Sequence, residues 1–127
     1  MPLVNIYLAK GKKPEYIKNL CDGLHQALVE TWNIPKDDRF HLVHEMPQSH
    51  VSIDKKMWGV DRSNDVIVFH IITSPRETSM KLALYQQLPE ILNEKIGLRK
   101  EDVFISIISN TREDWSFGMG KAQLLDN

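Results

Sequence analysis

The residue best suited to acid/base chemistry stands at the start of the chain. Met1 is followed by Pro2, and removal of Met1, expected when a small residue follows the initiator, leaves Pro2 with a secondary amine in place of an amide. An amine is costly to keep charged away from water, so an apolar pocket lowers its pKa toward neutrality. We therefore expect the Pro2 nitrogen to exchange protons at working pH. The alternative is that Pro2 follows Met1 by chance, because a dipeptide is weak evidence of a site.

Arg76 is the candidate for holding an anion. A helix is expected to begin at about Thr78, which puts the guanidinium near the positive end of the helix dipole. An anion that binds both the guanidinium and the free helix amides relieves this repulsion, and a substrate carboxylate suits that role. The alternative is a surface salt bridge, which is common and contributes little.

Two aromatic residues in the C-terminal tail form a third feature. Trp115 and Phe117 alternate, so in an extended segment both rings point the same way. They could wall a pocket, or they could make an ordinary contact beside the core.

An internal repeat positions these residues. When the chain is laid on itself so that Asp38 falls on Asp102, no gap is needed and the leucines of the two halves coincide. Each half reads as strand, helix and strand. The expected strands are residues 3–8, 40–45, 66–73 and 104–109, and the apolar helical stripes run over 17–32 and 84–96.

Two such units predict an α+β fold. The two strands of a βαβ unit are parallel, so we expect a four-stranded mixed sheet with two helices on one face. The uncovered face would then present apolar area that a monomer rarely tolerates, and oligomerisation through the sheets is the expected remedy. The alternating residues assigned to that face are Val43, Ile67, Phe69, Ile105 and Ile107.

The 127 residues fit one domain. We divide it into a first repeat at about 2–46, a connector at 47–64, a second repeat at about 65–110 and a C-terminal tail at 111–127.

Composition argues against several classes of protein. There are 16 basic and 17 acidic residues with no run of one sign, which indicates neither nucleic acid nor a membrane surface as partner. No apolar stretch approaches the roughly 20 residues that span a bilayer. The start lacks the features of a secretion signal, so a cytoplasmic location is expected. His41 and His44, three apart on a predicted strand, face opposite sides, so no metal site is expected.

The repeat, the Met-Pro start and the ending Trp-Ser-Phe-Gly-Met-Gly at residues 115–120 together resemble the malonate semialdehyde decarboxylase-like branch of the tautomerase superfamily. Residues 34–40, 62–63 and 74–76 agree with it, so the likeness covers essentially the whole chain. The resemblance implies the tautomerase fold, a homotrimer and chemistry without a cofactor.

The resemblance also assigns roles to residues at the expected site. It implies three catalytic residues, of which the arginine also binds substrate, and an apolar pocket wall from the tail. The catalytic residues are Pro2, Asp38 and Arg76, and the wall residues are Trp115, Phe117 and Leu124.

Two positions complicate this assignment. Asp38 could simply stabilise a turn, because Asp102 takes the same place in the second repeat, far from any N-terminal proline. Ser74 stands where the family has a further arginine, which weakens the case for a strict decarboxylase. Ser74 also fits a helix capping box with Glu77.

The expected activity is therefore keto–enol tautomerisation of small 2-oxo carboxylates. A decarboxylase or hydratase of malonate semialdehyde, or of a related 3-oxo acid, is the alternative within the enzyme class. The alternative from another class is a non-catalytic oligomeric binding module.

Overall fold

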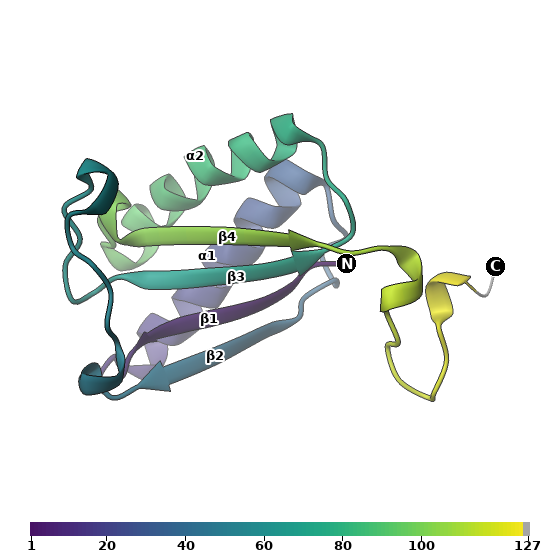
Figure 1. Ribbon diagram of the computed structural model, residues 1–127, viewed down its shortest axis with the longest axis horizontal. Helices are drawn as coiled ribbons and strands as arrows, with labels where there is room; N and C mark the ends of the chain where they lie inside the picture. The colour runs from purple at the N-terminus through teal and green to yellow at the C-terminus, as the bar shows by residue number, and fades with distance from the viewer. Residues whose placement is uncertain (126–127) are drawn as a thin grey trace.

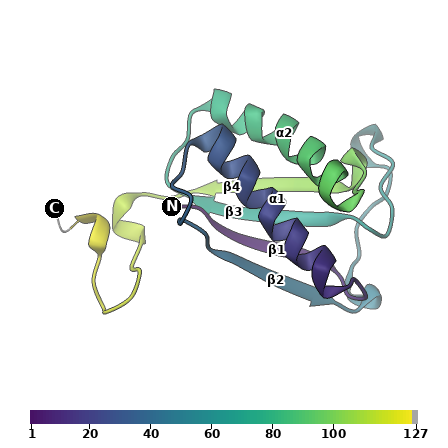
Figure 2. The same ribbon diagram turned by 180° about the vertical axis from the view of Figure 1, so that it is seen from behind.

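Four strands and two helices form two layers, with both helices packed on one face of the sheet (Figures 1 and 2). The computed structural model describes residues 1–125. The elements are β1 (Leu3–Ala9), α1 (Pro14–Trp32), β2 (His41–Met46), β3 (Ile67–Thr73), α2 (Thr78–Ile96) and β4 (Val103–Ser109). The strand order is β2-β1-β3-β4.

The strand directions confirm two βαβ units. β1 pairs in parallel with β2, and β3 in parallel with β4, whereas the central pair β1 and β3 is antiparallel. β1 and α1 begin at Leu3 and Pro14, and β3 and α2 begin at Ile67 and Thr78, the same offset that relates Asp38 to Asp102. The register of the sequence repeat is thus the register of the structure, and the predicted mixed sheet is confirmed.

The core lies between the sheet and the helices. Its largest fully buried side chains come from the inward positions of the central strands and from one stripe of each helix. They are Ile6, Leu20, Leu24, Leu28, Ile67, Phe69, Ile71, Leu84, Leu88 and Leu92. At Gly23 a Cβ would lie 2.8 Å from the Leu92 side chain, so the missing side chain allows α1 and α2 to pack closely.

The sequence interpretation assigned the wrong residues to the uncovered face. The five side chains placed there pack in or against the core on the helix side. The apolar residues that the helices leave exposed are on the opposite phase of the same strands, and include Leu42, Phe104 and Ile108. Alternation separates the two faces of a strand, but when both faces carry apolar residues it does not say which one the helices cover.

The start of α2 also corrects one local expectation. The helix begins at Thr78 with Glu77 as its N-cap residue, and no side chain caps it. Ser74 lies three residues before that cap, so the capping-box explanation for Ser74 is wrong.

The topology gathers four segments at one end of the sheet. Figures 1 and 2 show that the N-terminus, the loop from α1 to β2, the loop from β3 to α2 and the tail after β4 all lie at this end. The tail extends outward beyond the sheet. No helix within residues 1–125 is long and apolar enough to cross a membrane.

Candidate active site

A cavity of about 470 Å³ lies at this end of the sheet, beside the N-terminus. A volume of this order accommodates a small molecule. The lining residues include Met1, Ile34, Pro35, Asp37, Asp38 and Arg76. The structure therefore brings together the chain terminus, the predicted carboxylate and the predicted guanidinium. Pro2 itself is buried directly behind Met1.

Asp38 is carried by the tight turn that follows α1. Its backbone N–H donates to the Pro35 carbonyl at 3.0 Å. The His25 ring donates through Nε2 to the Lys36 carbonyl at 2.7 Å, because a carbonyl oxygen can only accept. These bonds hold the turn against α1. Asp38 is 9% exposed, and within the described chain its Oδ1 has no hydrogen-bond partner.

The electrostatics of the cavity favour a neutral terminal amine. Burial, followed by the positive charge of Arg76, lowers the pKa of the Met1 amine below its ordinary value of 8.0, while the Asp38 carboxylate partly opposes this change. An amine with a lowered pKa can act as a base near neutral pH. Pro2, whose nitrogen becomes the terminal amine if Met1 is removed, is the adjacent residue and is buried.

The pKa values of the two side chains beside the amine, Asp38 and Arg76, also depart from their ordinary values. Burial raises the pKa of Asp38, although the terminal amine and Arg76 act in the opposite direction. Burial lowers the pKa of Arg76 below its ordinary value, and Asp38 opposes that change. Arg76 stays charged at neutral pH because a guanidinium does not lose its proton in proteins. The cavity thus holds a permanent positive charge next to an acid/base pair.

The predicted wall residues lie elsewhere in the single chain. The rings of Trp115 and Phe117 stack with centroids 5.6 Å apart, which confirms that they point the same way. The Trp115 indole N–H donates to Asn110 Oδ1 at 2.7 Å, and Leu124 is tied to the tail through its carbonyl, which accepts from Arg112. None of the three wall residues is among those that line the cavity of their own chain.

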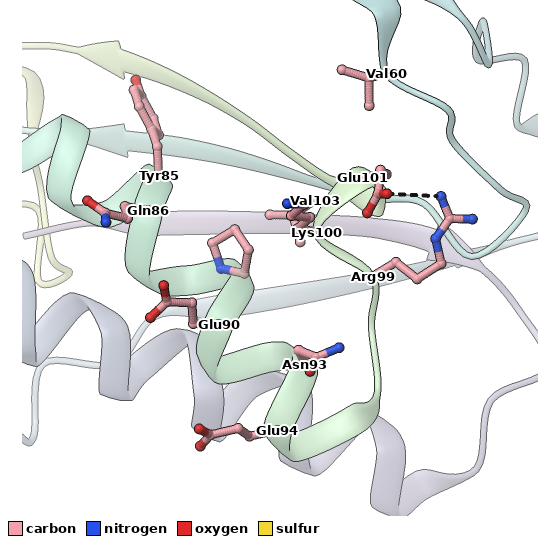
Figure 3. Close-up of a pocket in the computed structure, with 11 residues that line it drawn as sticks. Val60, Tyr85, Gln86, Glu90, Asn93, Glu94, Arg99, Lys100, Glu101 and Val103 are labelled. Atoms are coloured by element: carbon pink, nitrogen blue, oxygen red, sulfur yellow. Dashed lines mark ion pairs between the residues drawn. The ribbon is translucent and has the colours of Figure 1, made fainter.

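A larger groove runs along the outer side of α2 and does not contain the predicted residues (Figure 3). Its volume is about 1040 Å³. The Arg99 guanidinium in this groove is already engaged, because it pairs with Glu101 at 3.8 Å and donates to the Asp61 carbonyl. The groove contains none of Met1, Asp38 and Arg76, so we place the candidate site in the smaller cavity that brings these three together.

Two residues around the site had no functional assignment from sequence. His25 has no partner at metal-ligand spacing, and Trp32 ends the apolar helical stripe predicted at residues 17–32. The structure places His25 against the turn that carries Asp38, and Trp32 under the Arg76 guanidinium, 5.1 Å from its central carbon to the ring centroid. Neither contact has a signal in sequence spacing.

The histidines of β2 face opposite sides of the sheet, as predicted. His41 lies edge-on to His25 of α1, with ring centroids 6.1 Å apart. His44 stacks on Tyr7 at 4.5 Å and hydrogen-bonds Asn5 on the uncovered face. In residues 1–125 no three His, Cys, Asp or Glu side chains are grouped to hold a metal ion.

Comparison with known proteins agrees with the fold. A family model described as a tautomerase enzyme matches residues 38–118, and a second with the same description matches residues 2–62. The chain is 35% identical to a probable tautomerase, YusQ, of Bacillus subtilis (strain 168), over 99% of this chain and 100% of that protein.

Two solved structures of malonate semialdehyde decarboxylases are similar over the whole chain. One shares 30% identity with a TM-score of 0.93, covering 98% of this chain and 96% of that one. The FG41 enzyme, inhibited by 3-bromopropiolate, shares 34% identity with a TM-score of 0.90, covering 98% and 95%. The chain therefore belongs to the tautomerase superfamily of enzymes, in the branch of malonate semialdehyde decarboxylase.

Proposed function

We propose that the chain is a cofactor-independent keto–enol tautomerase of small 2-oxo carboxylates, with the Pro2 amine as its acid/base group. The observation that carries this proposal is the shared cavity of the terminus, Asp38 and Arg76. If Arg76 binds the substrate carboxylate, the 2-oxo acid lies beside the terminal amine. Burial and Arg76 lower the pKa of that amine. Asp38 would stabilise the protonated amine while the proton is in transit.

The proposed reaction needs only the transfer of one proton. The neutral amine removes a proton from C3 of the keto acid, the C3–H electron pair forms the C2=C3 double bond, and the carbonyl π electrons move to the oxygen. The protonated amine then gives the proton to that oxygen, which completes the enol and restores the neutral base. Arg76 steadies the negative charge that develops between these steps.

We also propose that the enzyme is a homotrimer and that its assembly completes the apolar pocket wall of Trp115, Phe117 and Leu124. Two observations support this. The three residues lie outside the cavity of their own chain, and the uncovered sheet face presents exposed apolar side chains. Phe117→Ala should then lower kcat/KM, whereas Met119→Ala, at a tail position 91% exposed, should not.

Decarboxylation or hydration of malonate semialdehyde is the second candidate. The similarity to two decarboxylases of that substrate favours it. It would use the protonated amine to polarise the carbonyl, so its rate should fall as pH rises, opposite to a tautomerase that uses the neutral amine. Ser74, in place of a further arginine, argues against it.

The test is a panel of small 2-oxo and 3-oxo acids, assayed with protein whose N-terminal mass shows Pro2 as the first residue. We expect enol–keto conversion of 2-oxo acids in the wild type. Pro2→Ala should reduce kcat/KM by about 10²-fold, since a positioned acid/base group typically contributes at least that factor. Arg76→Ala should raise KM. Arg99→Ala, in the larger groove, should change neither KM nor kcat/KM.

Each other outcome has a distinct meaning. Release of CO₂ from malonate semialdehyde without tautomerase activity would support the second candidate. Equal turnover by wild type and Pro2→Ala would contradict an acid/base role for the amine. If no oxo acid reacts but Arg76→Ala still weakens carboxylate binding, the protein is a non-catalytic binding module.

A further inference from the structure

The Arg76 guanidinium contacts two buried side chains. Its Nε–H donates to the Thr73 hydroxyl at 3.2 Å, and its central carbon lies 5.1 Å from the centroid of the Trp32 ring. Thr73 is fully buried at the end of β3, and Trp32, the last residue of α1, is 2% exposed. The hydroxyl fixes one edge of the guanidinium, and the indole supports its face.

Trp32 is itself anchored from the other repeat. Its indole N–H donates to the Met80 carbonyl, in the first turn of α2, at 3.0 Å. The ring therefore joins the end of α1 to the start of α2, and Arg76 lies in the loop just before that start. Both halves of the chain contribute to the place of one guanidinium.

The terminal nitrogens of Arg76 are left without protein partners. In the part of the chain that the structure describes, Arg76 makes no ion pair, and its only hydrogen bond is the one through Nε. The other four arginines all donate through a terminal nitrogen to a carbonyl or carboxylate. They are Arg39, Arg62, Arg99 and Arg112. Arg76 is thus held by its inner edge and face, with its outer edge available to a ligand in the cavity.

We propose that Trp32 and Thr73 are positioning residues that fix the orientation of Arg76 for two-pronged binding of a single substrate carboxylate. The inference rests on the proposed function, because it assumes that Arg76 binds the substrate carboxylate. A guanidinium binds a carboxylate best when the two planar groups are aligned, and a side chain already held in that alignment loses less rotamer freedom on binding. Trp32 and Thr73 do not touch the reacting atoms.

The test compares pairs of variants at each position. Thr73→Val keeps the shape but removes the hydroxyl that accepts from Arg76, whereas Thr73→Ser keeps that hydroxyl. Trp32→Leu removes the aromatic face, whereas Trp32→Phe keeps it. We expect Thr73→Val and Trp32→Leu each to raise the KM for a 2-oxo acid about tenfold. The Kd of pyruvate, measured by calorimetry, should rise by the same factor, which corresponds to about 1.4 kcal/mol. The value of kcat should stay within about twofold, and Thr73→Ser should stay near wild type. Trp32→Phe keeps the aromatic face but loses the hydrogen bond to Met80, so its Kd should fall between wild type and Trp32→Leu.

A cycle with Arg76→Ala separates positioning from general stability. Thr73→Val should raise the Kd of pyruvate in the wild type but not in Arg76→Ala, because no guanidinium remains to be oriented. An unchanged Kd in folded Thr73→Val overturns the inference, and so does an equal increase in both backgrounds. Because Thr73→Val is isosteric, this arm holds even if Trp32→Leu does not fold. If Arg76→Ala alone leaves the Kd of pyruvate unchanged, Arg76 does not bind the substrate carboxylate. That result would contradict the proposed function and, with it, the positioning role of Thr73 and Trp32.

Discussion

Asp38 and Asp102 occupy equivalent positions in the two repeats, but only Asp102 has its hydrogen bonds satisfied by the protein. Asp102 is 1% exposed and accepts the backbone N–H and the hydroxyl of Ser63, both at 2.7 Å. Ser63 belongs to the chain that leads into β3. In the first repeat Asp38 instead lines the cavity with Met1 and Arg76, and within residues 1–125 its Oδ1 has no hydrogen-bond partner. Asp102 thus anchors the fold through Ser63, whereas Asp38 keeps one carboxylate oxygen unbonded within the described residues, as the proposed acid/base role requires.

The same substitution should therefore have different effects at these two positions. Asp102→Asn replaces one acceptor oxygen with a donor that faces Ser63, and should lower the free energy of unfolding by about 1 to 3 kcal/mol. Asp38→Asn should leave the protein as stable as wild type or more so at pH 7, because burial raises the pKa of Asp38 and its charged form is disfavoured in the fold. Denaturant unfolding of both variants measures this difference.

Activity provides the second half of the comparison. Asp38→Asn should reduce kcat/KM for a 2-oxo acid, while Asp61→Asn, at an exposed position outside the cavity, should have little effect. If Asp38→Asn instead loses as much stability as Asp102→Asn and keeps full activity, Asp38 is a turn residue like its counterpart.

The sequence repeat was enough to predict the helices and strands and their order along the chain. The offset that superimposes Asp38 on Asp102 also relates the starts of β1 and β3 and of α1 and α2, because each repeat is the same supersecondary unit. The covered face of the sheet was assigned wrongly, because Ile107 and Ile108 are equally apolar and period-two alternation fits either phase. Only the packing of the helices decides between the two faces.

The candidate site was predictable only where its residues belong to a pattern. Pro2 and Arg76 could be proposed from the terminus and the helix start, whereas Asp38 came from the family resemblance. The fold places Met1, Asp38 and Arg76 around one cavity, and Pro2 is the buried residue next to Met1. Trp32 and Arg76 belong to different repeats, and an aromatic residue on an apolar helix stripe is normally core. The contact between them depends on how α1 packs beside α2, and no local spacing encodes that.

Removing the charge of Arg76 and removing the charge of Asp38 should shift the pH–rate profile in opposite directions. If the neutral amine is the base, kcat/KM rises as pH increases through the amine pKa. Arg76 lowers the pKa of the Met1 amine and Asp38 raises it, and we expect both to act in the same directions on the Pro2 amine. Arg76→Gln should therefore shift the rise to higher pH, and Asp38→Asn should shift it to lower pH. A pH–rate profile of each variant at low substrate concentration measures this, with Arg99→Gln as the unshifted control, and shifts in the same direction would contradict the assignment.

A histidine outside the site should make the fold sensitive to acid. The pKa of His41 is lowered from 6.5 to about 4, chiefly by burial and then by Arg39 and His25. Because protonation is easier in the unfolded chain, stability is complete above about pH 6.5 and is lost as pH falls from there toward 4. With allowance for partial exposure, the loss should be about 2 kcal/mol.

His41→Gln should remove most of this dependence, since glutamine does not titrate. His50→Gln, at an exposed position, serves as the control and should keep the wild-type slope. Denaturant melts between pH 7 and 4.5 measure the effect, and identical slopes for wild type and His41→Gln would show that His41 stays uncharged in both states or charges equally in both.

Assembly through the uncovered sheet face should depend on Leu42 and not on an equally exposed leucine of the helix layer. Leu42 of β2 is 53% exposed on that face, and Leu82 of α2 is 59% exposed on the other side of the molecule. A lysine at position 42 would place a charge in an apolar interface between copies, where it has no partner and bears the full cost of desolvation. Leu42→Lys should therefore sediment as a smaller species than wild type at micromolar concentration, and Leu82→Lys should keep the mass of a trimer. If the wild type is a monomer, or if only Leu82→Lys disrupts the trimer, the uncovered sheet face is not the interface. The proposal that assembly completes the apolar pocket wall would then lose its support.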